Sequence, residues 1–330
     1  MRVIVYGIGA IGGVIAARLA LSGFPVAGIA RGRQLEAVRS KGLTLRSPGG
    51  TAIAQFPVYE DPTEIAFTPA DVIVLATKSQ DSAAALERLN LANATALPIV
   101  CCQNGVANER LALRFFRTVI AVRVGMPADY SVPGEVVAFG ASSIGTLDLG
   151  RYPTGPSPVA ETLSHILQQA GFDARAHADI MPYKYQKLLG NLRNIVDALF
   201  ADPQVQQHWY DQVLAEGLAV LAAAGIAIAP PDTGAPAALG AVPGVARIGS
   251  SSLQSIVRAA GSVETDYLNG EIALLGRLHG VPTPVNVALC GFSKRLVSGA
   301  VLPGGLSETE LRTELDRASQ YEASPDEKQR

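Results

Sequence analysis

The N-terminal stretch Met1-Arg-Val-Ile-Val-Tyr-Gly-Ile-Gly-Ala-Ile-Gly-Gly13 decides the fold of this chain. Val3 to Tyr6 is a β-branched, apolar run of the length expected for a buried parallel strand. The sequence from Ala10 to Ser22 is rich in alanine, leucine and isoleucine and stops before Gly23, which is typical of a helix that ends at glycine. The stretch therefore predicts a strand, a tight turn and a helix at the beginning of the chain.

Three glycines in this turn have the G-x-G-x-x-G spacing of dinucleotide-binding loops. Gly7 permits the tight turn, Gly9 lets a pyrophosphate approach the backbone, and Gly12 lets the helix and the strand pack closely. Ala10 and Ile11 complete the loop, and the N-terminus of the following helix faces the phosphate charge. Because the motif lies between a strand and a helix, it predicts a dinucleotide site, with an ordinary glycine-rich turn as the alternative.

Length and composition favour a two-domain protein. The chain has 330 residues, 48% of them hydrophobic, and a formal net charge of −2 without a basic block. Nucleic acid is therefore not expected as a partner. No uninterrupted apolar run reaches the roughly 18–20 residues of a membrane helix, and we expect no signal peptide before the first strand. Cys101, Cys102 and Cys290 lack metal-ligand spacing, so we expect reduced thiols, no metal site and a cytoplasmic protein.

Strand and helix signals alternate over the first half of the chain. We expect strands at Val26 to Ala30, Asp71 to Thr77, Ile99 to Gln103, Val119 to Val124, Val136 to Ile144 and Ala174 to Ala178. Leu43 to Arg46 and Ala52 to Val58 flank a Pro-Gly-Gly turn and predict a hairpin inserted after the second helix. Ser142 to Gly145 is a candidate antiparallel extension of the sheet. The alternation predicts a doubly wound α/β domain over residues 1–178.

Long apolar helices dominate from Met181 onward, where the strand signals end. We therefore place a domain boundary near residue 178 and expect an all-helical domain over residues 179–330. The segment Pro230 to Gly244 is rich in proline, glycine and alanine and connects two of its helices. The helical domain carries much apolar surface, which is compatible with a homodimer.

The first helix of this second domain carries an unusual set of polar residues. Lys187, Asn191 and Asn194 are spaced i, i+4 and i+7 and therefore share one sector of a helix. Asparagine is disfavoured within helices, so two amides beside one lysine indicate a bound partner. A polar surface stripe on an amphipathic helix is the alternative.

The loop after the second predicted strand bears on the choice of cofactor. An acidic residue there would bond the ribose 2′-hydroxyl of NAD, whereas arginine pairs with the 2′-phosphate of NADP. The loop reads Arg31-Gly32-Arg33, and no Asp or Glu occurs between Gly23 and Gln34. The sequence therefore favours NADPH, with two solvated arginines as the alternative. Lys78 and Asn104 follow two further strands and are expected at the same edge of the sheet.

With these features the chain resembles the ketopantoate reductase family (2-dehydropantoate 2-reductases). The resemblance extends from Gly7 to about Asn286 and rests on the glycine loop, on Asn104-Gly105, on Lys187 followed by Asn191, on Glu264-x-Asp-Tyr-x-Asn-Gly270 and on Leu278-His-Gly-Val-Pro-Thr-Pro284. It implies a Rossmann-type N-terminal domain followed by a helical domain. It also implies NADPH-dependent reduction of a 2-keto acid to a 2-hydroxy acid, most directly of 2-dehydropantoate to pantoate in pantothenate biosynthesis.

The resemblance also implies roles for individual residues. Lys187 corresponds to the catalytic lysine of the family, and Glu264 to the acid that engages the substrate hydroxyl. The positions near the cofactor are Arg31, Lys78 and Asn104, and those around the substrate are Asn104, Asn191, Asn194, Ser251 and Glu264. This chemistry suits the residue types, because an ammonium beside the ketone oxygen stabilises the charge that hydride transfer leaves there and can donate the proton.

Three positions depart from the family pattern. Ser255 replaces an aspartate, Ile195 replaces an amide and Ile248 replaces an asparagine, all in the region that shapes the substrate pocket. These changes leave a paralogue that reduces a different 2-keto acid as an alternative. A related β-hydroxyacid dehydrogenase would carry a glycine-rich substrate loop, which the sequence lacks. An NADP-binding redox sensor without turnover is a third alternative, and Lys187 and Glu264 together argue against it.

Overall fold

The computed structural model describes residues 1–130, 132–230, 238–247, 249, 253–254, 256 and 263–322. The contacts divide the chain into two compact units. The first unit comprises Met1–Tyr185 and Ile228–Arg247, and the second comprises Gln186–Ala227 and Ile248–Arg330. The domain boundary near residue 178 stays a prediction. The division by contacts falls after Tyr185, and the later segment Ile228–Arg247 also belongs to the first unit.

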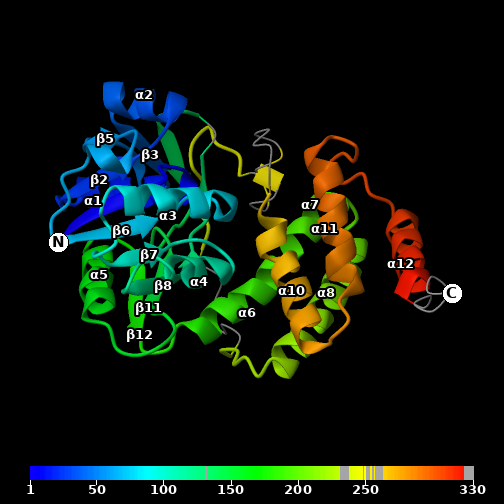
Figure 1. The fold of residues 1–330 in the computed structure, drawn as a ribbon. Helices are drawn as coiled ribbons and strands as arrows, with labels where there is room; N and C mark the ends of the chain where they lie inside the picture. The colour runs from blue at the N-terminus through cyan, green and yellow to red at the C-terminus, as the bar shows by residue number, and fades with distance from the viewer. Residues whose placement is uncertain are drawn as a thin grey trace. The chain divides into compact units, whose positions relative to one another are not determined.

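The first unit is built on an eight-stranded sheet with the strand order β12-β11-β8-β7-β6-β1-β2-β5 (Figure 1). Its strands are β1 (Arg2–Tyr6), β2 (Val26–Ile29), β5 (Val58–Tyr59), β6 (Asp71–Leu75), β7 (Ile99–Cys101), β8 (Val119–Gly125), β11 (Thr146–Arg151) and β12 (Asp173–His177). The strands from β5 to β8 in this order are parallel, whereas β11 is antiparallel to β8 and parallel to β12. The predicted doubly wound α/β sheet is confirmed.

Helices cover both faces of this sheet. They are α1 (Ala10–Leu21), α2 (Gly32–Lys41), α3 (Ser82–Leu91), α4 (Ala107–Ala112) and α5 (Pro158–Gln169). Alternate residues of β1 enter different cores: Val3 and Val5 pack with residues of α1 and α5, and Ile4 packs with residues of α3 and α4. Because both faces are covered, the central strands β1, β6 and β7 have nearly continuous apolar sequences without a polar side.

A second, four-stranded sheet packs against helix α1. It has the order β4-β3-β10-β9 and consists of β3 (Leu43–Ser47), β4 (Gly50–Ala54), β9 (Ala128–Asp129) and β10 (Glu135–Ala138). Strands β3 and β4 form the predicted hairpin. Helix α1 contacts β1 and β2 of the large sheet and all four strands of the small one. A helix that lies between two sheets must be apolar on nearly every side, and α1 has a single charged residue, Arg18, in its last turn.

The prediction that residues 136–144 continue the large sheet is wrong. Strand β10 pairs with β3 and β9 in the small sheet, and the antiparallel addition to the large sheet is β11 instead of Ser142 to Gly145. Apolar alternation identifies a strand but not its neighbour. The partner is decided by packing, since Val136 lies against α1 where Gly13 leaves room for it.

The second unit is helical. It contains the end of α6 (Met181–Asn191), then α7 (Arg193–Leu199), α8 (Pro203–Ala223), the 3₁₀ helix η3 (Glu264–Tyr267), α10 (Asn269–His279), α11 (Pro284–Val297) and α12 (Glu308–Glu322). Helix α10 packs on α8 and α11, and α7 packs on the same two helices (Figure 1). Among the described helices, none combines the length and the apolar character needed to span a membrane.

Part of the predicted connection between two helices belongs to the first unit. In the described residues 238–247, Leu239 forms a β-bridge with Gly140, and Val242 packs with Val137 and Phe139. The connection therefore packs against the small sheet. Proline and glycine content alone indicates a connection but not what the connection contacts.

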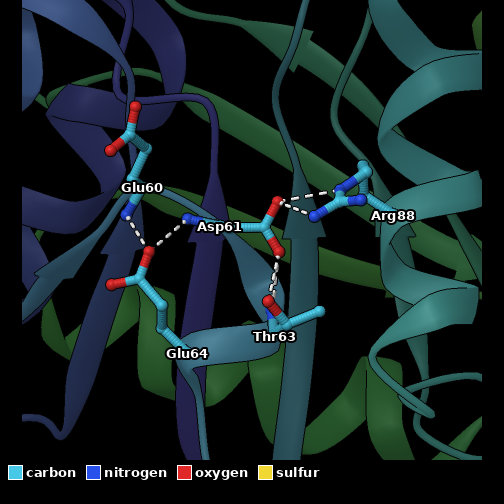
Figure 2. A network of polar contacts seen from close by, with 5 residues as sticks. All are labelled: Glu60, Asp61, Thr63, Glu64 and Arg88. Atoms are coloured by element: carbon cyan, nitrogen blue, oxygen red, sulfur yellow. Dashed lines mark hydrogen bonds and ion pairs between the residues drawn. The ribbon is translucent and has the colours of Figure 1, made fainter.

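A capping network ties the loop after β5 to helix α3 (Figure 2). The carboxylate of Asp61 accepts hydrogen bonds from the backbone N–H of Thr63 at 2.9 Å and from Nε of Arg88 at 2.8 Å. Glu64 Oε1 in turn accepts from the backbone N–H of Glu60 and of Asp61. Burial alone would raise the pKa of Asp61, but the bonds from Thr63 and Arg88 lower it on balance.

A second charged contact joins the beginnings of β1 and β6. Arg2 donates from Nε to Asp71 Oδ1 at 2.9 Å and from Nη2 to Asp71 Oδ2 at 2.6 Å, and the backbone N–H of Thr68 donates to Oδ2 at 2.7 Å. Asp71 as a whole is only 2% exposed. Burial alone would raise the pKa of Asp71, but the hydrogen bonds from Arg2 and Thr68 lower it below the ordinary value.

We predict that Asp71→Asn destabilises the protein at neutral pH by about 1.5–3 kcal/mol, the range for hydrogen bonds to a charged group. Because the folded-state pKa is lowered, the stabilisation from Asp71 is present above the unfolded pKa and is lost as the pH falls through the folded value. Urea unfolding from pH 7 to pH 3 should therefore show a shallower acid loss of the free energy of unfolding in the variant. Asp173→Asn, which breaks an exposed pair with Arg175, is the control. An unchanged acid slope in Asp71→Asn would contradict the prediction.

Candidate functional site

The glycine loop between β1 and α1 leaves no room for side chains at two of its three glycines. Gly7 has a φ of +102°, and a Cβ there would lie 2.8 Å from the backbone nitrogen of Thr77. A Cβ on Gly12 would lie 2.1 Å from the carbonyl oxygen of Gly7. A Cβ on Gly9, by contrast, would meet no non-adjacent residue within 4 Å in the part of the chain that the structure describes. The fold therefore requires Gly7 and Gly12, whereas Gly9 faces open space.

The residues around this open space fit a dinucleotide. Gly9 is the N-cap of α1, so no side chain caps the helix, and the first turn, which begins with Ala10 and Ile11, has no acidic residue. Free N–H groups and the positive end of the helix dipole thus remain for an anion. The hydroxyl of Thr77, which follows the neighbouring strand β6, is buried and has no partner among the described residues. Donors of this kind suit a pyrophosphate and its ribose.

Charged residues follow the strands on either side of β1. Arg31 is the N-cap of α2 just after β2, its side chain is 83% exposed, and Nη2 lies 3.5 Å from Asp81 Oδ1. Arg33 is exposed as well. Lys78, which follows β6, is the N-cap of the 3₁₀ helix η2 (Ser79–Asp81). The two cations predicted near the cofactor phosphate therefore lie at the carboxyl ends of the two neighbours of β1, as expected for this kind of sheet.

Tyr6, at the end of β1, lies close enough to Arg31, Asp61 and Arg88 for all three to act on its hydroxyl. Burial raises the pKa of its hydroxyl, and the carboxylate of Asp61 raises it further, while Arg88 and Arg31 oppose the shift. Asp81 also acts on this hydroxyl. Sequence reasoning did not single out Tyr6 or Asp81, although the place of Asp81 three residues after Lys78 could have indicated its role at this edge of the sheet.

Asn104 follows β7 at the same edge and stands before Gly105, whose φ is +76°. A buried ion pair lies beside it: Lys184 Nζ contacts Glu109 Oε1 and donates to the carbonyl oxygen of Gln103 at 3.2 Å. The side chains of Lys184 and Glu109 are 2% and 0% exposed. Sequence reasoning missed this pair, because its members are 75 residues apart and neither belongs to a motif.

The cysteines are free, as predicted. Cys101 and Cys102 are buried, and Cys290 is partly buried. Burial raises the pKa of the Cys101 thiol well above its ordinary value, and the nearby Glu109 adds to the shift. The thiol is therefore protonated and unreactive at neutral pH. Within the described ranges, His, Cys, Asp and Glu side chains nowhere gather in threes as metal ligands.

In the second unit, the predicted helix over Lys187, Asn191 and Asn194 is interrupted. Helix α6 ends at Asn191, Leu192 forms a turn, and Asn194 lies in α7. The prediction of one continuous helix is therefore wrong, although Leu192 keeps helical dihedrals of −57° and −26°. Lys187 and Asn191 remain one turn apart on α6, and Lys187 is half-buried. Nδ2 of Asn191 is buried and has no partner among the described residues.

Glu264 lies in η3, a 3₁₀ turn that directly precedes helix α10. A 3₁₀ turn at a helix N-terminus cannot be distinguished from the helix by sequence pattern. The side chain of Glu264 is buried, with 8% exposed. Ser251, Ile248 and Ser255 lie outside the described residues. Ile195, which stands in α7, is 1% exposed.

These features define a class of protein: an oxidoreductase with a dinucleotide-binding Rossmann-type unit and a helical second unit. The family model described as "Ketopantoate reductase PanE/ApbA" matches residues 3–153, and the model of the C-terminal part of the same family matches residues 179–296. The chain belongs to the ketopantoate reductase family. Its members are enzymes that reduce 2-keto acids with a nicotinamide dinucleotide.

Individual relatives extend over nearly the whole chain. The 2-dehydropantoate 2-reductase of Archaeoglobus fulgidus is 28% identical over 90% of this chain and 98% of its own length. That of Pyrococcus abyssi is 26% identical over 89% and 97%. A ketopantoate reductase structure from Ralstonia eutropha has a TM-score of 0.76 at 24% identity and covers 91% of this chain and 99% of its own. A D-mandelate dehydrogenase with NADH and anilino(oxo)acetate has a TM-score of 0.74 at 22% identity, with 94% and 100% covered. At these identities the two structures share the fold.

We predict that Gly12→Ala and Gly9→Ala have different effects. A methyl group on Gly12 would overlap the carbonyl oxygen of Gly7, so Gly12→Ala should lower the free energy of unfolding by about 1–3 kcal/mol. A methyl group on Gly9 meets no non-adjacent residue in the described part of the chain, so Gly9→Ala should fold nearly normally but bind the dinucleotide at least about tenfold more weakly, because the methyl group occupies the space of the phosphate. Thermal unfolding and calorimetric titration with NADPH measure both effects. Equal losses of stability in the two variants would refute this separation.

Proposed function

We propose that this protein reduces a 2-keto acid to a 2-hydroxy acid with NADPH, and that its leading substrate is 2-dehydropantoate, which becomes pantoate in pantothenate biosynthesis. The observation that carries the proposal is the pair on α6: Lys187 and, one turn later, Asn191 with its buried, unpartnered Nδ2. A buried donor without a partner is costly, so a bound ligand is the expected acceptor. The relatives named 2-dehydropantoate 2-reductase support the choice of substrate.

The residue types account for the reaction. When bound, the reduced nicotinamide supplies the hydride that adds to the keto carbon. Lys187 stabilises the charge that develops on the carbonyl oxygen and donates the proton that completes the hydroxyl group. Asn191 donates a hydrogen bond to a substrate oxygen through Nδ2. Glu264 accepts a hydrogen bond from the substrate hydroxyl, and Asn194 and Ser251 complete the substrate contacts.

The cofactor contacts belong to the first unit. The loop with Gly9 and the first amides of α1 receive the pyrophosphate. Arg31 and Lys78 bind the 2′-phosphate and so favour NADPH, and Asn104 contributes at the end of β7. The D-mandelate dehydrogenase neighbours contain NADH, so we infer the preference from this chain's own cations. Asp81 moderates it, because its carboxylate already pairs with Arg31.

A second candidate is a paralogue that reduces another 2-keto acid. The observation that favours it is Ile195, an apolar and 1% exposed residue in α7, where the family commonly has an amide. A pocket without that amide has fewer means to hold a second polar group of the substrate. The proposal also includes a cytoplasmic location and no nucleic-acid partner. It further includes a homodimer, which the exposed Leu274 and Leu278 on α10 support.

A screen of NADPH oxidation across 2-keto acids tests the proposed function. It compares 2-dehydropantoate with its analogue lacking the hydroxyl group and with branched and aromatic 2-keto acids. For a dedicated enzyme, kcat/KM for 2-dehydropantoate should exceed that for the analogue lacking the hydroxyl group by as much as ~10⁴-fold, whereas for the paralogue the two values should differ little. NADPH binding without turnover of any 2-keto acid would favour the redox sensor and refute the proposal.

We predict that Lys187→Ala lowers kcat by about 10²–10⁴-fold, the usual contribution of a positioned acid. NADPH should still bind, because the glycine loop and Arg31 belong to the other unit. Stopped-flow hydride transfer and NADPH titration measure the two effects. Lys294→Ala is the matched control, since the side chain of Lys294 in α11 is 72% exposed. Retention of more than about a tenth of the wild-type rate would exclude the acid role.

We predict that Arg31→Ala reduces the preference for NADPH over NADH by roughly 10–100-fold, as the loss of one charge-assisted hydrogen bond implies. Asp81→Asn should shift the preference in the opposite direction, because Arg31 is then released from its pair. The ratio of kcat/KM for the two cofactors is the measurement. Arg175→Ala, at an exposed arginine of β12, serves as the control. If Arg31→Ala leaves the ratio at its wild-type value, another residue reads the 2′-phosphate.

A further inference from the structure

A chain of buried polar contacts crosses the helices of the second unit and begins at Glu216 in α8. The carboxylate of Glu216 accepts from the backbone N–H of Val285 at 2.8 Å and of Asn286 at 3.0 Å. These are first-turn amides of α11, whose own N-cap residue, Thr283, makes no side-chain cap. Glu216 therefore caps α11 from another helix, and its negative charge suits the positive end of the α11 dipole.

Asn286 carries the chain of contacts onward. It is fully buried, and its Nδ2 donates to Glu216 Oε2 at 2.7 Å and to the carbonyl oxygen of Val213 at 3.2 Å. Both amide protons are therefore used, which fixes the orientation of the amide group and points Oδ1 toward Asn269. Oδ1 accepts from Asn269 Nδ2 at 3.0 Å. The bonds of Asn286 thus determine the orientation of the Asn269 side chain.

Asn269 lies at the junction that separates η3, which contains Glu264, from α10. Asn269 is only 1% exposed. Its Nδ2 also donates to the carbonyl oxygen of Leu192, at 3.5 Å. Leu192 is the single residue between α6 and α7, and it follows Asn191 directly. One amide group therefore connects the segment of Glu264 with the interruption beside Asn191.

We propose that Asn269, oriented by Asn286 and Glu216, is a positioning residue for substrate recognition. It holds the η3 segment at a set distance from the turn at Leu192, and so sets the spacing between Glu264 and Asn191. This inference rests on the proposed function, in which those two residues contact the 2-keto acid. Small displacements of positioning groups are known to cost up to ~10²-fold in catalytic efficiency.

The burial of these amides favours a positioning role over packing alone. Oδ1 of Asn269 is buried and has no partner among the described residues, which is unfavourable for stability. Leucine at this position would remove that unpaired oxygen, but it would also take away the donor to Asn286 Oδ1 and to the Leu192 carbonyl oxygen. The amide provides what leucine cannot, a directed bond to the Leu192 carbonyl.

Asn269→Leu tests the proposal in the full-length protein. We expect KM for 2-dehydropantoate, or for the best 2-keto acid of the screen, to rise about 10–100-fold with a smaller change in kcat. The Kd for NADPH should stay within about twofold of the wild-type value, because the variant is expected to weaken the binding of the substrate and not of the cofactor. Hydrogen exchange should accelerate together in residues 192–196 and 264–267. Leu311→Ala, which truncates a fully buried side chain of α12, controls for stability.

The outcomes separate this inference from the proposed function. If the wild-type protein reduces no 2-keto acid, the proposed function fails, while exchange at the two segments still decides whether Asn269 connects them. An unchanged KM and unchanged exchange in Asn269→Leu would overturn the positioning role. So would an equal rise of KM in Leu311→Ala, because that result would indicate a general effect of stability. If Asn269→Leu does not fold, Glu216→Gln, which keeps the shape but weakens the cap, should raise KM by a smaller factor, within the ~10²-fold cost of misplaced groups. An unchanged KM in Glu216→Gln counts against the proposal.

Discussion

The close approach of helix α1 to strand β1 is the contact on which the first unit depends. A Cβ on Gly12 would lie 2.1 Å from the carbonyl oxygen of Gly7, and one on Gly13 would lie 2.7 Å from a methyl group of Val136 in β10. Two adjacent glycines therefore bring one helix against both sheets. The same approach holds the first turn of α1 at the end of β1, where its free amides can bind an anion.

The polar groups of the first unit gather at the edge defined by that contact. Arg31, Lys78 and Asn104 follow β2, β6 and β7, which are close to β1 in the order of the sheet. Parallel strands end at one edge, so residues far apart in the sequence become neighbours there. Ion pairs lie at the same edge of the sheet. Asp81 pairs with Arg31, and Lys184 of the buried Lys184–Glu109 pair donates to the carbonyl oxygen of the residue before Asn104.

The second unit solves a different problem, because it must hold polar side chains inside a helical core. Its buried amides at Asn269 and Asn286 and the carboxylate of Glu216 are joined by hydrogen bonds over three helices. Burial raises the pKa of Glu216, and the N–H groups of Asn286 and Val285 oppose the shift. A connected polar network specifies one arrangement of helices more sharply than apolar packing does. The interruption at Leu192 lies at the end of that network.

The sequence by itself determined the strand–turn–helix unit, the doubly wound sheet, the glycine loop and the resemblance to a reductase family, because these depend on neighbouring residues and on short periods. Only the tertiary structure decided that β10 joins a second sheet, that Leu192 interrupts the helix after Lys187, and that residues 238–247 pack on the first unit. The Lys184–Glu109 pair could not be predicted from the sequence either. Strand partners and buried charge pairs join segments that are far apart in the chain. Which segments pair is decided by how they pack in the folded protein, and the local sequence pattern does not identify the partner.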